Sequence, residues 1–220
     1  MKKLFVLACA ALASLSITAQ TVALNTEGRE EAYVKTIIDR STKNIAGLNI
    51  ADKAKHEAVR NIVCNRYFEL NDIYAERDEA MNKAKSLTGD AQKAAREAAS
   101  DHCDSRLYRS HFAFSANLSN YLTEAEVTAI KDAMTYNKVK VTYDAYCDEI
   151  LRLTAEEKLQ IYNWLCEARE FAMDAESSNK KHDWFNKYKG RINNYLSKHG
   201  YDLRKEGEEW QKRIAARKKQ

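Results

Sequence analysis

The chain contains no proline, whereas average usage of about 5% would place roughly 11 in a sequence of this length. It also has only six glycines. Proline breaks helix interiors, so its absence leaves long helices uninterrupted. Gly47, Gly89 and Gly200 stand where periodic apolar segments end, which is where left-handed helix caps occur. These absences favour a chain of successive helices.

A hydrophobic run long enough to cross a membrane is also missing. The apolar run at residues 4–17 falls short of the roughly 20 residues that a membrane helix needs. It follows Lys2 and Lys3 and precedes the small residues Ala19 and Ala23, which is the order of a secretory signal peptide. We therefore expect a signal peptide at residues 1–19, cleaved between 19 and 23, and a periplasmic or extracellular domain at 24–220.

The sequence lacks a strong excess of either positive or negative charge. The formal net charge is +4, and it falls to +2 when Lys2 and Lys3 leave with the signal peptide. Acidic and basic residues are interleaved, whereas a nucleic-acid surface needs a clustered basic face. Only residues 212–219 are locally basic, as a solvated helix end often is. No nucleic-acid partner is expected.

Helix-start signals recur along the chain. Thr123 and Thr154 are each followed three residues later by glutamate, which is the pattern of a capping box. Residues 138–143 alternate for too few positions to build a sheet and are interpreted as a connector. The fold class predicted is all-α, an irregular multi-helix bundle in a single domain. Its helices are expected at 28–46, 50–86, 89–119, 124–137, 143–151, 155–177, 180–199 and 203–217.

Four cysteines remain after removal of the signal peptide, an even number in a compartment that permits disulfides. The first two fall in one helical stretch and its successor, and so do the last two. This favours pairing of Cys64 with Cys103 and of Cys147 with Cys166. Buried free thiols are the alternative.

Motifs for catalysis or metal binding are missing. His56-Glu57 begins like a zinc-protease helix, but the position for the second histidine holds Arg60. The sequence has no glycine-rich phosphate loop, no serine elbow and no Cys-x-x-Cys pair. No catalytic residue, metal ligand or cofactor is therefore predicted.

One segment, residues 181–196, is dense in aromatic, basic and amide side chains. Its aromatics fall on one helical stripe, as core residues do, and Trp184 stands at the edge of that stripe. Gly190 inside a helix suggests close approach of another group. The ligand-binding candidates are His182, Trp184, Lys189, Arg191, Asn193 and Asn194. A secondary candidate cluster contains Arg109 and His111, although a buried histidine is the default interpretation of His111.

Several motifs carry a family resemblance across nearly the whole mature chain. They are Leu70-Asn71-Asp72-Ile73, Lys131-Asp132-x-Met134-Thr135-Tyr136, Val141-Thr142-Tyr143, Glu167-Ala168-Arg169-Glu170 and Lys181-His182-x-Trp184-Phe185. With them the chain resembles an uncharacterised family of secreted bacterial all-helical proteins labelled sugar-binding. The resemblance implies an exported, non-catalytic, carbohydrate-associated protein of a polysaccharide-degrading bacterium, with an oligosaccharide or polysaccharide as partner.

Two other function classes remain open. A periplasmic chaperone or stress sensor would present a broad apolar or basic concave surface to unfolded clients. An enzyme of unrecognised type acting on carbohydrate would need a titratable pair in a cleft, such as His182 or His111 beside Asp183 or Glu170.

Overall fold

Every regular element in the part of the chain that the computed structural model describes, residues 21–218, is helical. The predicted all-α fold is confirmed, whereas the expected signal peptide lies outside the described residues. The elements in chain order are α1 (Glu31–Ile45), the short 3-10 helix η1 (Ala46–Leu48), α2 (Lys53–Ala84), α3 (Gly89–Ser119), α4 (Glu124–Met134), α5 (Lys138–Glu149), α6 (Ala155–Met173), α7 (Ser178–Lys198) and α8 (Leu203–Arg217).

Two helix starts have the capping boxes that the sequence predicts. At the start of α4, Thr123 Oγ1 accepts from the Glu126 amide at 3.4 Å, while Glu126 accepts from the Thr123 amide at 2.8 Å. Thr154 and Glu157 repeat this exchange at α6, at 3.2 and 2.9 Å. These bonds satisfy amides that the first helical turn leaves without partners.

The connector predicted at residues 138–143 is wrong, because α5 already begins at Lys138. The turn before it contains two consecutive left-handed residues, Tyr136 at φ +60° and Asn137 at φ +53°. The Asn137 amide donates to the Asp132 carbonyl at 2.8 Å, which closes α4 and redirects the chain at once into α5. Val139 and Tyr146, seven residues apart, then share the buried face. A four-residue alternation is too short to distinguish a strand from such a helix.

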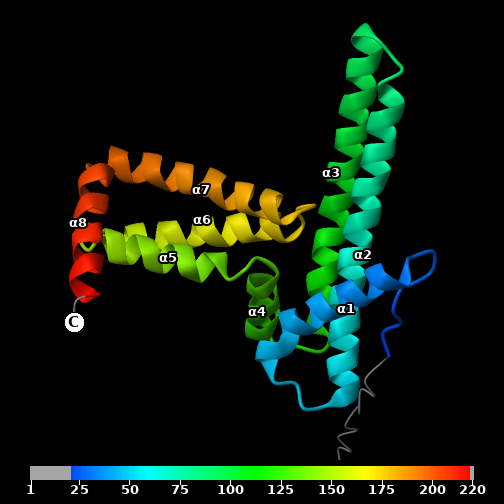
Figure 1. Ribbon diagram of the computed structural model, residues 1–220, viewed down its shortest axis with the longest axis horizontal. Coiled ribbons are helices and arrows are strands. Elements are labelled where there is room, and N and C mark those ends of the chain that lie inside the picture. Colours follow the sequence, from blue (N-terminus) through cyan, green and yellow to red (C-terminus); the bar gives the residue numbers. More distant parts are fainter. Residues whose placement is uncertain (1–20, 219–220) are drawn as a thin grey trace, which may run out of the picture.

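The helices form two groups, each with its own core. In Figure 1, α2 and α3 form a long hairpin that projects beyond the other helices, with α1 and α4 near its base, while α5, α6 and α7 lie side by side and α8 crosses their far ends. The first core includes Ile62, Val63, Leu118 and Ile130, and the second includes Ile161, Leu165, Ile192 and Leu196. Met173, at the end of α6, packs in the first core and so joins the two groups.

The disulfides predicted for the four cysteines are not formed, and all four are free thiols. In the α2–α3 hairpin, Arg66 bonds Ser110, which shows that these two positions face each other. Because the helices are antiparallel, Cys64 lies level with position 112, which is about nine residues from Cys103. At 1.5 Å per residue this separates the two by about 14 Å along the helices, whereas disulfide-bonded Cα atoms lie within about 7 Å.

The second pair is separated in the same way. The rings of Tyr143 and Tyr162 contact each other between α5 and α6. Cys147 therefore lies level with a position about eight residues, or about 12 Å, from Cys166. Adjacent antiparallel helices bring two cysteines together only when both are at similar distances from the turn, and neither pair meets that condition.

Candidate functional site

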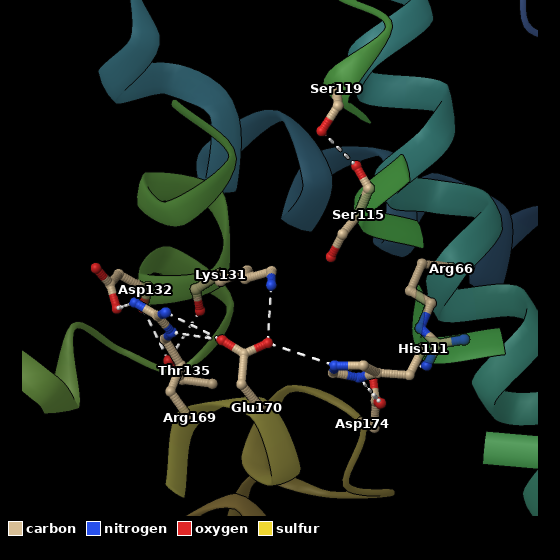
Figure 2. Close-up of polar contacts among 10 residues, drawn as sticks. All are labelled: Arg66, His111, Ser115, Ser119, Lys131, Asp132, Thr135, Arg169, Glu170 and Asp174. Carbon is tan, nitrogen blue, oxygen red and sulfur yellow. Dashed lines mark hydrogen bonds and ion pairs between the residues drawn. The ribbon is translucent and has the colours of Figure 1, made fainter. Parts of the chain in front are cut away.

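The two helix groups meet at a set of charged side chains, the junction cluster, formed by Arg66, His111, Lys131, Asp132, Arg169, Glu170 and Asp174. Figure 2 shows the imidazole of His111, from α3, facing Glu170 and Asp174 from the end of α6. Its Nδ1 lies 2.7 Å from Asp174 and its Nε2 3.4 Å from Glu170. The hydrogen bond to Asp174, followed by that to Glu170, raises the pKa of His111 to about 9.

Glu170 is the shared acceptor of the cluster. Lys131 Nζ donates to it at 2.8 Å, and Arg169, which also pairs with Asp132 at 2.9 Å, contacts its other oxygen at 3.0 Å. Burial alone would raise the pKa of Glu170, but the bonds from His111 and Lys131 outweigh burial and hold it at about 2. Glu170 and His111 therefore both remain charged near neutral pH.

Arg66 completes the cluster from α2. Its side chain is buried and donates to Ser110 and Glu69, both at 2.7 Å. Its second terminal nitrogen lies 2.7 Å from Asp174 Oδ1, an ion pair whose angle is not that of a hydrogen bond. Because Asp174 receives both Arg66 and His111, the end of α6 is held firmly against α2 and α3.

Beside this cluster lies a cavity of about 380 Å³, here called the tyrosine pocket. It is formed by α1, α2, the α4–α5 turn and the α6–α7 turn, with Lys181 from the first turns of α7. Ligand pockets usually have volumes of about 300–1,000 Å³. Four tyrosines, Tyr33, Tyr67, Tyr74 and Tyr136, contribute to its wall, and its polar lining includes Arg40, Asn44, Asn71, Glu176, Ser177, Ser178 and Lys181.

Hydrogen bonds orient the tyrosines of this pocket. Tyr74 donates its hydroxyl to the Asp174 carbonyl at 2.8 Å, so a hydrogen bond connects the pocket to the junction cluster. Asn44 Nδ2 donates to the Tyr67 hydroxyl at 2.8 Å, and burial raises the pKa of Tyr67 to about 12. Both phenols are therefore neutral at physiological pH, as hydrogen-bonding walls of a binding site should be.

Lys181 is the most unusual residue of the pocket, since only 7% of its surface is exposed. Its ammonium donates to the Met134 carbonyl at 2.9 Å and lies 5.6 Å from the centre of the Tyr67 ring. Burial, and then the nearby charge of Arg40, lower the pKa of Lys181 to about 8.

Tyr136 forms an exposed edge of the pocket, with half of its surface in solvent. Its ring is stacked on that of His182, with centroids 5.5 Å apart and planes inclined by 24°. The left-handed backbone of Tyr136 is uncommon for a residue with a bulky side chain. Backbone strain of this kind concentrates at functional sites.

The residues predicted from the sequence do not converge on one site. Of the six on α7, His182 alone contacts a side chain that lines the tyrosine pocket. Trp184 stacks on Phe171 at 4.6 Å, and Asn193 accepts a hydrogen bond from Tyr146 at 2.7 Å. Lys189 is exposed.

Arg191 and Asn194 line a second, shallower surface cavity of about 570 Å³ together with Gly190. Arg191 lies over the Trp164 ring at 4.6 Å. A Cβ atom at Gly190 would meet no atom within 4 Å, so the close approach predicted at this glycine is wrong.

In the secondary candidate cluster, Arg109 is exposed, and His111 belongs to the junction cluster. Sequence reasoning missed Arg40, Asn44, Tyr67 and Lys181. Lys181 begins the aromatic segment, but nothing in its neighbours distinguishes a buried lysine from a solvated one. The missed residues come from helices far apart in the chain, and only the tertiary fold brings them together.

A third cavity, of about 600 Å³, lies between the segment before α1 and the α2–α3 hairpin. Several of its polar side chains are already engaged. Arg29 pairs with Asp72 at 2.6 Å, and Asn65 bonds the backbone of Asn25 and Ala23. These contacts attach residues 23–29 to α2, and they leave the tyrosine pocket as the better candidate for a ligand.

Residues 21–218 lack two further features. No group of three or more His, Cys, Asp or Glu side chains in that range is arranged to hold a metal ion. No helix in the same range is long and apolar enough to cross a membrane.

The sequence of the pocket and the junction cluster falls within one family. No curated protein matches the chain. The family model described as a protein of unknown function, DUF3826, matches residues 34–216, from α1 to α8. This range covers most of the chain, including all but Tyr33 of the pocket residues described above. The chain therefore belongs to the DUF3826 family of proteins of unknown function.

Proposed function

We propose that this protein is an exported, non-catalytic saccharide-binding protein whose ligand occupies the tyrosine pocket. The observation that carries the proposal is the combination of aromatic walls and polar side chains in one cavity of about 380 Å³. Protein sites for small ligands usually combine an apolar wall with a few placed polar groups.

The aromatic residues supply the surfaces that a sugar ring needs. A pyranose has an apolar face of C–H groups, which packs on the face of an aromatic ring. Tyr136 is the best platform, because it is exposed at the pocket edge and backed by the stacked ring of His182. The amides of Asn44 and Asn71 supply donors and acceptors for hydroxyl groups at the same cavity.

The carboxylates support a binding role better than a catalytic one. Glycosidases use two carboxylic acids that flank the scissile bond. Among the described residues that line the pocket, Glu176 is the sole carboxylate, and it pairs with Arg77 at 2.6 Å. His111 and Glu170 do contact each other, but neither lines any of the three cavities, and neither has a pKa near 7.

The exposed apolar side chains favour this function over a chaperone. A client-binding chaperone needs a broad continuous apolar surface. The large exposed apolar residues of this chain are instead distributed over several helices and turns, with Tyr108 and Phe112 on α3 and Leu151 after α5 as examples. Export to the periplasm or beyond rests on the signal peptide expected at residues 1–19.

Calorimetric titration of residues 24–220 with a panel of mono- and oligosaccharides tests the proposal. Tyr136→Ala and Asn71→Ala should each weaken saturable binding by at least about tenfold, since 1.4 kcal/mol is a factor of ten. Tyr108→Ala removes an aromatic that is 71% exposed on α3 and does not line the pocket, so it should bind as the parent does.

Circular dichroism of each variant should show unchanged helicity. Absence of binding across the panel would refute the saccharide function, and suppression of client aggregation by the same protein would then identify a chaperone. Binding that survives both pocket substitutions would place the saccharide elsewhere on the molecule.

A further inference from the structure

The buried ammonium of Lys181 lacks an anionic partner. Its surface is 7% exposed, and among residues 21–218 it forms no ion pair with a carboxylate. Asp174 acts on its charge from a longer distance, but that carboxylate is already paired with Arg66 and His111. Buried lysines are rare unless they are paired. An ammonium has three donors, and the carbonyl of Met134 accepts one of them. Lys181 lines the tyrosine pocket, so its two remaining N–H donors lie at that cavity.

A second cation faces the same cavity without a carboxylate. Arg40, on α1, lies over the Tyr67 ring with its guanidinium carbon 5.4 Å from the centroid. Within the described part of the chain it forms no ion pair. Burial lowers the pKa of Lys181, and the nearby positive charge of Arg40 lowers it further. An anion bound in the pocket would offset the repulsion between these two positive charges.

The start of α7 adds to this positive potential. Ser177 is the N-cap of this 21-residue helix, and Ser177 and Ser178 both line the pocket. The Ser177 hydroxyl accepts from the Lys180 amide, whereas the amides of the first helical turn before Lys180 have no partner within the helix. Helix N-termini attract anions through such amides and through the helix dipole.

The single acid of the lining does not cancel these charges. Glu176 is bound by Arg77 at 2.6 Å, and Arg77 also pairs with Asp78 at 2.6 Å, so Glu176 is a paired carboxylate that shares its cation. The pocket therefore presents two cations and a helix N-terminus to its contents, with no free carboxylate among the described lining residues.

Resting on the saccharide-binding function proposed above, we infer that the ligand is an anionic saccharide, whose carboxylate or sulfate ester lies between Lys181, Arg40 and the N-terminus of α7. The sugar ring packs on the tyrosines, and the anion replaces the partner that Lys181 lacks. Arginine matches the geometry of both groups, since its planar fork binds two oxygens at once.

Ligands that differ only in charge provide the first test. The mature protein is titrated with galacturonic acid trimers, with the same trimers as methyl esters, with galactose 6-sulfate and with galactose. The acid should bind at least tenfold more tightly than its ester, or the sulfated sugar at least tenfold more tightly than galactose. Whichever comparison shows the difference identifies the anion, and the preference should decrease as salt screens the charges.

Charge variants locate the effect. Lys181→Met and Arg40→Gln should each abolish most of the preference for the charged ligand over the uncharged one. Arg40 is exposed, so its substitution tests the inference even if Lys181→Met folds poorly. The matched control is Lys189→Met, which removes an exposed charge of α7 that does not line the pocket.

Proton uptake gives an independent measurement. Because the pKa of Lys181 is lowered to about 8 in the free pocket, an anion bound beside it should raise that value and draw a proton from solution at pH 8. Titrations in two buffers of different ionisation enthalpy measure this uptake, which Lys181→Met should remove.

Two results would overturn the inference in distinguishable ways. Equal affinity for charged and uncharged sugars, lost in Tyr136→Ala, refutes the anion and leaves the saccharide function standing. Failure of every sugar to bind refutes both.

Discussion

Two titratable side chains, the half-buried His111 and the buried Lys181, have opposite electrostatic surroundings. His111 contacts two carboxylates and has its pKa raised to about 9. Lys181 contacts none and has its pKa lowered to about 8. The first arrangement satisfies a charge internally and suits a structural role, while the second leaves a charge for an external partner.

The pH dependence of stability should reveal the structural role of His111. Its folded pKa of about 9 lies above its ordinary value of 6.5, so its contribution is complete below about pH 6.5 and is lost as pH rises through 9. The shift corresponds to a contribution on the order of 3 kcal/mol. Urea unfolding at pH 6 and pH 9.5 should show this loss in the parent and a much smaller one in His111→Gln. Equal losses in the two proteins would contradict the assignment.

For single residues, the sequence predicted which face of a helix a side chain occupies better than which other side chains it contacts. Trp184 was expected as a ligand platform or a core residue, and its stacking on Phe171 agrees with the packing alternative. Helical periodicity places a side chain on a face of its own helix, but it does not say which other helix covers that face. For the same reason Lys181 could not be recognised as buried.

Helix caps are the elements whose strength is most directly testable. Thr123→Ala and Thr154→Ala each remove a side chain that accepts from the third helical amide, and each should lower the free energy of unfolding by about 0.5–2 kcal/mol. Thr88→Ala is the matched control, because Thr88 is also an N-cap but forms no side-chain cap bond. Chemical denaturation of the three variants measures the difference. A control as costly as the other two would show that capping is not the cause.

The separation of the cysteines along their helices predicts four reactive thiols. Mature protein denatured without reductant should take up four equivalents of an alkylating reagent, counted by mass spectrometry. In the native state Cys64 and Cys103 should react more slowly than Cys147 and Cys166, because burial both blocks them and raises their pKa. Uptake of two equivalents or none after denaturation would show that disulfides do form.

Helix existence was predictable because its signals are local. Capping boxes lie within four residues, and α3 and α8 have the predicted bounds, 89–119 and 203–217. The α4–α5 turn was missed because nothing in the local sequence favours the left-handed backbone that Tyr136 adopts. The predicted cysteine pairing was wrong because two cysteines on consecutive helices can lie at different distances from the turn that joins them.

At the level of the whole molecule, the junction cluster joins two cores and borders the candidate site. Asp174→Asn should lower stability by about 3–5 kcal/mol, since it removes the carboxylate that both the buried Arg66 and His111 contact. It should also weaken ligand binding, because residues 175–178 form a wall of the pocket. Leu196→Ala, in the second core, should cost about 2–5 kcal/mol.

The comparison of these two variants tests whether stability and binding are linked through the junction. Affinity measured where both are folded should decrease in Asp174→Asn alone. Similar affinities in the two would show that the cluster holds the fold without shaping the pocket. The pocket itself was beyond prediction, because its wall draws on α1, α2, α7 and two turns that meet only in the assembled fold.

The projecting α2–α3 hairpin also determines how the molecule moves in solution. At 1.5 Å per residue, the 32 residues of α2 span about 48 Å, whereas a compact chain of this length has a radius of gyration of about 17 Å. Because the distal part of this helix and its partner α3 project beyond the other helices, they increase hydrodynamic drag more than they increase mass. The protein should therefore elute from a size-exclusion column ahead of compact standards of equal mass, and light scattering should return a smaller mass than the elution volume implies.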